Sequence, residues 1–152
     1  MTEIRLSGNI IDRVSLSFIS EDNIIIGKTI IKNDDGYFPF ICFNNLAKIM
    51  SRMVDGQDKI SITGILKDYI YNDFNDRPHV VKIILMTKVT VNGRGIYTTF
   101  NGSRENVIAN LNSMWQKLIR KNADVFDVVR YEIVNRIRQA ESEAEYAFSK
   151  NE

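Results

Sequence analysis

The sequence is poor in the residues that build disulfides and metal sites. Its 152 residues include one cysteine (Cys42) and one histidine (His79). A single cysteine cannot form a disulfide framework, and one cysteine with one histidine cannot supply the ligands of a structural zinc site. The sequence therefore predicts no disulfide and no bound metal, and it favours a reducing compartment.

The chain also lacks an excess charge of one sign and any long apolar run. Twenty lysines and arginines balance 19 aspartates and glutamates, which gives a net charge of +1. This balance excludes strong global attraction to polyanions, so nucleic-acid binding would need a local basic face. No apolar stretch approaches membrane-spanning length, and the first residues contain no signal-peptide core. We expect a cytoplasmic protein without membrane contact.

Motifs of common enzymes are missing as well. There is no phosphate-binding glycine loop and no nucleophile elbow. Asp34 and Asp35, like Asp73 and Asp76, lie in turns, where aspartate is first a turn-forming residue. Paired carboxylates for hydrolysis would also need a pocket and a positioned base, which nothing marks. We expect no catalytic residues, no cofactor and no enzymatic activity.

The first part of the chain shows the alternating apolar pattern of β-strands. Strands are predicted over residues 3–14, 24–32, 38–43, 60–71 and 80–91, with a short amphipathic helix over 45–53. Asp35-Gly36 predicts a hairpin between the second and third strands, and Gly8 indicates a bulge or a close backbone approach. Five strands with a helix between the third and fourth are the order of an OB-fold barrel with Greek-key connections.

One face of the fourth predicted strand carries Lys67, Tyr69 and Tyr71. On an open face, cations can neutralise phosphates and flat rings can stack on bases, as a single-stranded nucleic-acid platform requires. The two tyrosines fit ordinary cross-strand packing equally well. On the third strand, Phe40 and Phe43 point to opposite faces, and we expect Phe43 to be the exposed one.

The loop that follows this strand places Phe74 and Arg77 among asparagines and aspartates. A large apolar residue in such a loop has little local reason to be there. Phe74 could contact DNA, cap the end of the barrel or touch another subunit, and Arg77 could bind phosphate or remain solvated.

Several segments in order resemble the bacterial and phage single-stranded-DNA-binding protein family. They are Gly8-Asn9-Ile10-Ile11, FPFICFNNLAKIM, an Asp-Gly turn and ISITGILKDYIYND, and the match covers roughly residues 2–92. The resemblance implies base-stacking roles for Phe43 and Tyr71, a basic contact at Lys67, homo-oligomers and no catalysis. The chain lacks the family's acidic tail with a terminal Pro-Phe and ends in SKNE. This departure favours a phage or mobile-element protein over the cellular form.

The remaining residues predict a C-terminal α-helical hairpin. Ser103 is a suitable N-cap for a first helix, and the second helix begins after Asp124. The apolar side of such a hairpin needs a partner surface, which could be the barrel or the same hairpin of another subunit. We expect an oligomer interface formed by Leu111, Trp115, Leu118, Phe126, Ile133 and Ile137. The expected domains are residues 1–95, which bind nucleic acid, and residues 96–152, which join subunits or dock a partner.

Together these patterns predict non-sequence-specific binding of single-stranded DNA in replication or recombination, with RNA left open, by a homodimer or homotetramer. The expected contacts are Arg5, Lys28, Phe43, Lys67, Tyr69, Tyr71, Phe74, Arg77, Lys82 and Lys88. The alternative is a protein-interaction adaptor of the primosome or conjugation type, in which the helical hairpin docks on a replication or recombination protein. Near-neutral charge and the missing acidic tail favour this alternative.

Overall fold

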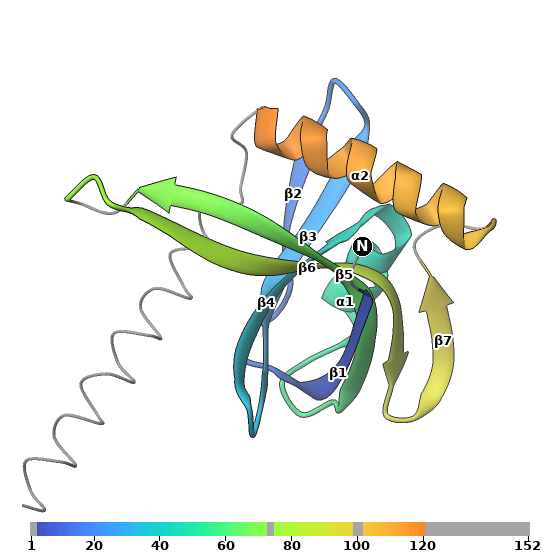
Figure 1. Ribbon diagram of the computed structural model, residues 1–152. Coiled ribbons are helices and arrows are strands. Elements are labelled where there is room, and N and C mark those ends of the chain that lie inside the picture. The colour runs from blue at the N-terminus through green and yellow to red at the C-terminus, as the bar shows by residue number, and fades with distance from the viewer. Residues whose placement is uncertain (1–2, 73–74, 99–101, 121–152) are drawn as a thin grey trace, which may run out of the picture.

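The computed structural model describes residues 3–72, 75–98 and 102–120. These residues form seven strands and two helices (Figure 1). In chain order they are β1 (Glu3–Ile10), β2 (Ser15–Ile19), β3 (Ile24–Asn33), β4 (Gly36–Phe43), α1 (Asn44–Met53), β5 (Ile60–Asn72), β6 (Pro78–Val91), β7 (Arg94–Thr98) and α2 (Arg104–Arg120). Neither helix in these ranges is long and apolar enough to cross a membrane.

Five strands close into a ring in the order β1, β5, β6, β4, β3 and back to β1. Parallel β4 and β6 pair at Phe40 and Ile84, and antiparallel β1 and β3 pair at Ile10 and Ile31. α1 connects β4 to β5, so the ring strands and the helix follow the predicted order. Within the described ranges, β2 pairs with β3 alone and β7 with β6 alone, so both are edge strands.

Two strands were not predicted from the sequence. The first strand ends at Ile10 instead of Val14, and β2 follows as a separate strand. β7 is reached through a turn at Asn92 and Gly93, where φ is 51° and 71°. Positive φ at both turn positions is typical of a two-residue hairpin, for which Asn-Gly is a strong sequence signal. This signal could have located β7.

The interior of the ring holds a first apolar cluster, which we call the inner core. Its members include Phe40, Cys42, Leu46, Ala47, Met50, Ile62, Ile84 and Met86, so α1 contributes directly to it. Gly8 lies where β1 meets β3, and a Cβ atom at this position would lie 2.2 Å from the carbonyl oxygen of Lys32. The close backbone approach predicted at Gly8 is therefore confirmed.

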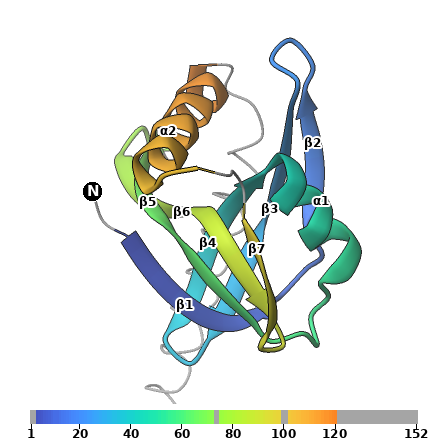
Figure 2. The same ribbon diagram turned by 90° about the vertical axis from the view of Figure 1, so that its right-hand side faces the viewer.

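The outer face of the ring carries a second apolar cluster, the outer core. Strand residues Ile26, Ile41, Phe43, Ile65, Val81, Ile83 and Leu85 pack there with Leu111, Trp115 and Leu118 of α2. Figures 1 and 2 show α2 lying across the strands, on a different side of the ring from α1. Several strand segments are thus buried on both faces, which explains why β3 and β4 have nearly continuous apolar sequences.

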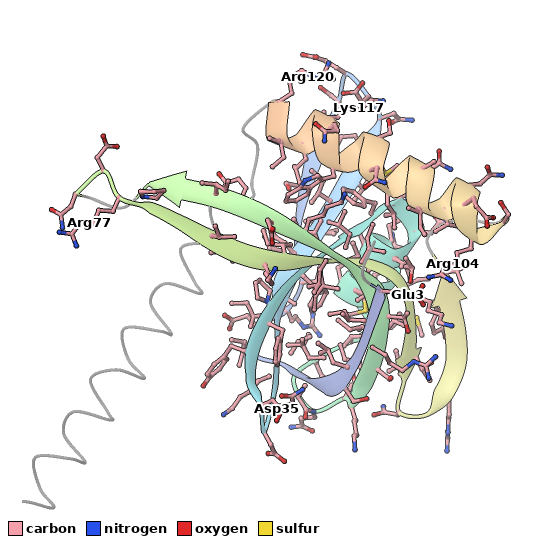
Figure 3. All side chains as sticks on the ribbon, viewed as in Figure 1. Glu3, Asp35, Arg77, Arg104, Lys117 and Arg120 are labelled. Atoms are coloured by element: carbon pink, nitrogen blue, oxygen red, sulfur yellow. The ribbon has the colours of Figure 1, made fainter. Side chains whose placement is uncertain are left out.

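Ion pairs attach both ends of α2 to the strands. Arg104 in the first turn lies 2.7 Å from Glu3 of β1 (Figure 3), and Lys117 near the other end lies 3.7 Å from Asp22 in the β2–β3 turn. The predicted N-cap is confirmed, because the Asn106 backbone N–H donates a hydrogen bond to Ser103 Oγ at 3.3 Å. The two ion pairs connect α2 to β1 and to the β2–β3 turn.

Candidate nucleic-acid interface

The structure is inconsistent with two of the predicted DNA contacts, Phe43 and Lys28. Phe43 is fully buried in the outer core, and Lys28 is 6% exposed. The expectation that Phe43 is exposed is wrong. Phe40 and Phe43 do lie on opposite faces of β4, but α2 and neighbouring strands bury the outer face. Lys28 lies opposite Ile41 on this outer face, so it too is enclosed.

The β5 face that was expected to be open is closed over part of its length. Ile65 is buried beneath α2, and Tyr69 packs half-buried against the outer core. Lys67 is also half-buried. These residues therefore do not form a flat, fully open stacking platform.

The apolar side of α2 is used within the chain. Leu111 and Leu118 have no exposed surface, and Trp115 is 5% exposed. The expectation that they form an oligomer interface is wrong for these three residues, because they pack on the ring of the same chain. Of the two partner surfaces considered for this helix, the structure selects the ring.

Several expected contacts cannot be placed. Phe74 lies outside the described residues, as do Phe126, Ile133 and Ile137 of the expected interface. Tyr71 is paired with His79 in the register of β5 and β6, but its side chain is outside the described part of the structure.

Strand pairing brings Arg5 and Lys88 into one row on the outer face, where Arg5 is exposed, Lys88 is half-buried and Thr63 between them is 5% exposed. Arg5 of β1 lies opposite Thr63 of β5, and Thr63 lies opposite Lys88 of β6. Directly opposed residues in antiparallel strands share a face, so both cations point outward beside Thr63. Neighbouring strands are about 4.8 Å apart, which separates the two backbones by roughly 10 Å.

Hydroxyl groups surround this row of charges. Ser7, Ser61 and Thr90 form the next row across the same strands, and Thr98 of β7 lies opposite Lys88. We call this area the polar strip, and it comprises Arg5, Ser7, Ser61, Thr63, Lys88, Thr90 and Thr98. The hydroxyl residues were not predicted as contacts, because only the strand register shows that they adjoin the two cations.

The polar strip has a positive character. Neither Arg5 nor Lys88 forms an ion pair with any described residue. Glu3 lies on the same face of β1, but Arg104 neutralises it at 2.7 Å. Cations and hydroxyls on a strand face are the groups that bind phosphate oxygens in protein–nucleic acid complexes.

Beyond the ring, β5 and β6 extend as a hairpin arm that projects from the molecule (Figure 1). Lys82 in this arm is 3.0 Å from Asp68, so the charge of this predicted contact is compensated. Arg77 is exposed at the tip (Figure 3). Ile70 and Val80 are paired across the strands and are 65% and 50% exposed. The arm thus combines charges of both signs with an exposed apolar pair.

The described residues contain no group of histidine, cysteine and carboxylate side chains able to hold a metal ion. Cys42 lies in the inner core, and burial raises the pKa of its thiol to about 12. At neutral pH this thiol is protonated, which removes the nucleophilic form of the side chain.

No protein-family model and no curated protein matches the chain. Among solved structures, the SSB domain of a protein from Synechococcus sp. is similar, with a TM-score of 0.47 and 10% sequence identity. The similarity covers 59% of this chain and 93% of that domain.

Proposed function

We propose that the protein binds single-stranded DNA without sequence specificity, and that the polar strip is its phosphate-binding surface. The observation that carries this proposal is the single row formed by Arg5, Thr63 and Lys88. The strand order supports it: a closed five-stranded ring with a helix between its third and fourth strands has the order of an OB-type fold, which binds oligonucleotides.

In this proposal the chain binds the DNA backbone mainly by electrostatics. Arg5 and Lys88 displace counterions from phosphates, and the hydroxyls of Ser61 and Thr90 donate hydrogen bonds to phosphate oxygens. The polar strip has no aromatic residue. Base stacking would therefore come from the arm, where part of the Tyr69 side chain is exposed. With two cations in the row that form no ion pair with a described residue, affinity should be modest and strongly dependent on salt.

A titration of labelled oligo-dT by fluorescence anisotropy at several salt concentrations tests the proposal, with a duplex of equal length as the reference. Arg5→Ala and Lys88→Ala should each weaken binding and lower the slope of log affinity against log salt by roughly 0.7. Lys48→Ala, which removes an exposed lysine of α1 outside the strip, is the matched control. If the double variant Arg5→Ala/Lys88→Ala bound oligo-dT as tightly as the wild type, the proposal would be overturned.

The exposed pair of Ile70 and Val80 favours a second function, a protein-interaction adaptor that contacts its partner through the arm. Exposed apolar residues beside an ion pair are common in protein interfaces and contribute little to phosphate binding. The same titration separates the two functions, because an adaptor of this kind would bind neither the single strand nor the duplex at low salt.

A further inference from the structure

The edge strand β2 lacks charged residues and proline, two features that usually protect a sheet edge. Within the described residues it pairs with β3 alone, and its sequence Ser-Leu-Ser-Phe-Ile contains no charge and no proline. Leu16 and Phe18 are 48% and 60% exposed on one face of this strand. Figure 2 shows β2 at the margin of the sheet. Natural proteins protect such edges with charges, proline or covering segments, because an open edge pairs readily with another strand.

We propose that β2 is a dimerisation edge, which pairs antiparallel with β2 of a second copy of this chain about a twofold axis at Ser17. This register is centred on the five-residue strand and places Leu16 opposite Phe18 of the second copy, on one face. The twofold axis repeats that contact, so four exposed apolar side chains cover one another. This interface is independent of the proposed DNA-binding function and does not use α2.

Charges that flank β2 complement each other in this register. Arg13 before the strand comes to lie beside Glu21 of the second copy, and the twofold axis generates this contact twice. Both residues are exposed within one chain. A second copy of the chain already carries a cation, two apolar residues and an anion in the order that this pairing needs. An unrelated partner strand would have to carry the same order by chance.

The Ser17 hydroxyl supports the position of the twofold axis. Its oxygen is buried and has no hydrogen-bond partner among the described residues, an arrangement that costs free energy. Across the proposed axis the two Ser17 side chains are directly opposite, with Cβ atoms about 5 Å apart. A rotation about χ1 would turn both hydroxyls toward the axis, where one can donate to the other.

Cysteine crosslinking of the full chain tests the register directly. Ser17→Cys should form a disulfide-linked dimer under mild oxidation, since opposed antiparallel residues have a Cα separation of about 5 Å, within disulfide range. Ser15→Cys is the matched control, because the two copies of residue 15 would lie about 13 Å apart. The native Cys42 is buried and adds no crosslink of its own.

A charge swap measured by sedimentation velocity tests the interface without crosslinking. Arg13→Glu should weaken dimerisation by at least about tenfold, and the double variant Arg13→Glu/Glu21→Arg should restore it. Phe18→Lys should abolish the dimer, whereas Ile70→Lys, an equally exposed position on the arm, should leave it intact. A wild-type chain that stays monomeric at its highest soluble concentration overturns the proposal. So does a dimer that is insensitive to these substitutions or that crosslinks through residue 15 instead of residue 17.

Discussion

Phe40 and Phe43 lie three residues apart on β4, are both fully buried, and belong to different cores. Phe40 packs inside the ring, and Phe43 packs outside it, in the cluster that α2 completes. A strand of a small ring usually has one face in solvent. Here α2 gives β4 a second buried face, so the helix is part of the structural core.

The first prediction concerns Phe43. Phe43→Ala should lower the free energy of unfolding by about 3–5 kcal/mol, since it removes a large side chain from a packed cluster. Urea denaturation followed by circular dichroism measures this change. Ile70→Ala at an exposed position should change stability by no more than about 0.5 kcal/mol. A Phe43→Ala variant with unchanged stability and weaker DNA binding would show instead that Phe43 is an exposed contact.

The second prediction separates the contributions that hold α2 in place. Trp115→Ala should cost about 3–5 kcal/mol because it opens a cavity in the outer core. Arg104→Ala should cost at most about 1 kcal/mol, because the Arg104–Glu3 pair is exposed and screened by solvent. Urea titrations at low and high salt check both values, and only the Arg104 effect should shrink with salt. Equal losses for the two variants would mean that the ion pair, and not apolar packing, anchors the helix.

The spacing of apolar residues, alternating in strands and helical in residues 45–53, was enough to locate the ring strands and α1, although β1 ends earlier than predicted. Ile60 and Ile62 point inward, and Ser61 points outward, as a period of two requires. The hairpin between β3 and β4 also followed from local residues, with Asn33 and Gly36 paired around Asp34 and Asp35. Local sequence determines these features, so a single sequence is enough to find them.

The candidate site could be predicted only in part, because it depends on contacts between distant segments. Arg5 and Lys88 were recognised as cations, but only the register of three strands places them in one row. Phe43 was misassigned because the sequence does not show which sheet face α2 covers. Trp115 was assigned to an oligomer interface because its partner strand residues precede it by 30 or more positions along the chain, and the sequence does not show that they lie beneath it.

The third prediction concerns Cys42. Burial raises the pKa of its thiol from 9.0 to about 12, so in the unfolded chain the thiol loses its proton at lower pH than in the folded chain. The unfolded state is therefore favoured as pH rises between these values, and stability should fall by at most about 1.4 kcal/mol per pH unit. Below pH 9 this contribution is constant. Urea titrations across this range, compared with Cys42→Ala, isolate the effect.

A thiol reagent gives an independent measurement of the same burial. At pH 8 the native protein should react far more slowly than the urea-unfolded chain, because the buried thiol is both protonated and inaccessible. Equal rates in the two states would mean that the inner core opens frequently around β4.

The last prediction follows from the ion pair between Asp68 and Lys82 on the arm, whose side-chain atoms are 3.0 Å apart. If the arm assists DNA binding, Asp68 competes with phosphate for the Lys82 ammonium and also repels the DNA backbone. Asp68→Asn keeps the size and shape of the side chain and removes its charge. The variant should bind oligo-dT several-fold more tightly and show a salt slope that is larger by roughly 0.7, corresponding to one more phosphate contact.

Two further variants determine whether Lys82 causes the gain. Lys82→Ala alone should have little effect, because the charge of Lys82 is already compensated, whereas the double variant Asp68→Asn/Lys82→Ala should lose most of the added affinity. Asp34→Asn, which removes an exposed carboxylate from the distant β3–β4 turn, controls for the change in net charge. If Asp34→Asn raised affinity as much as Asp68→Asn, the gain would reflect overall charge, and the arm would have no part in binding the strand.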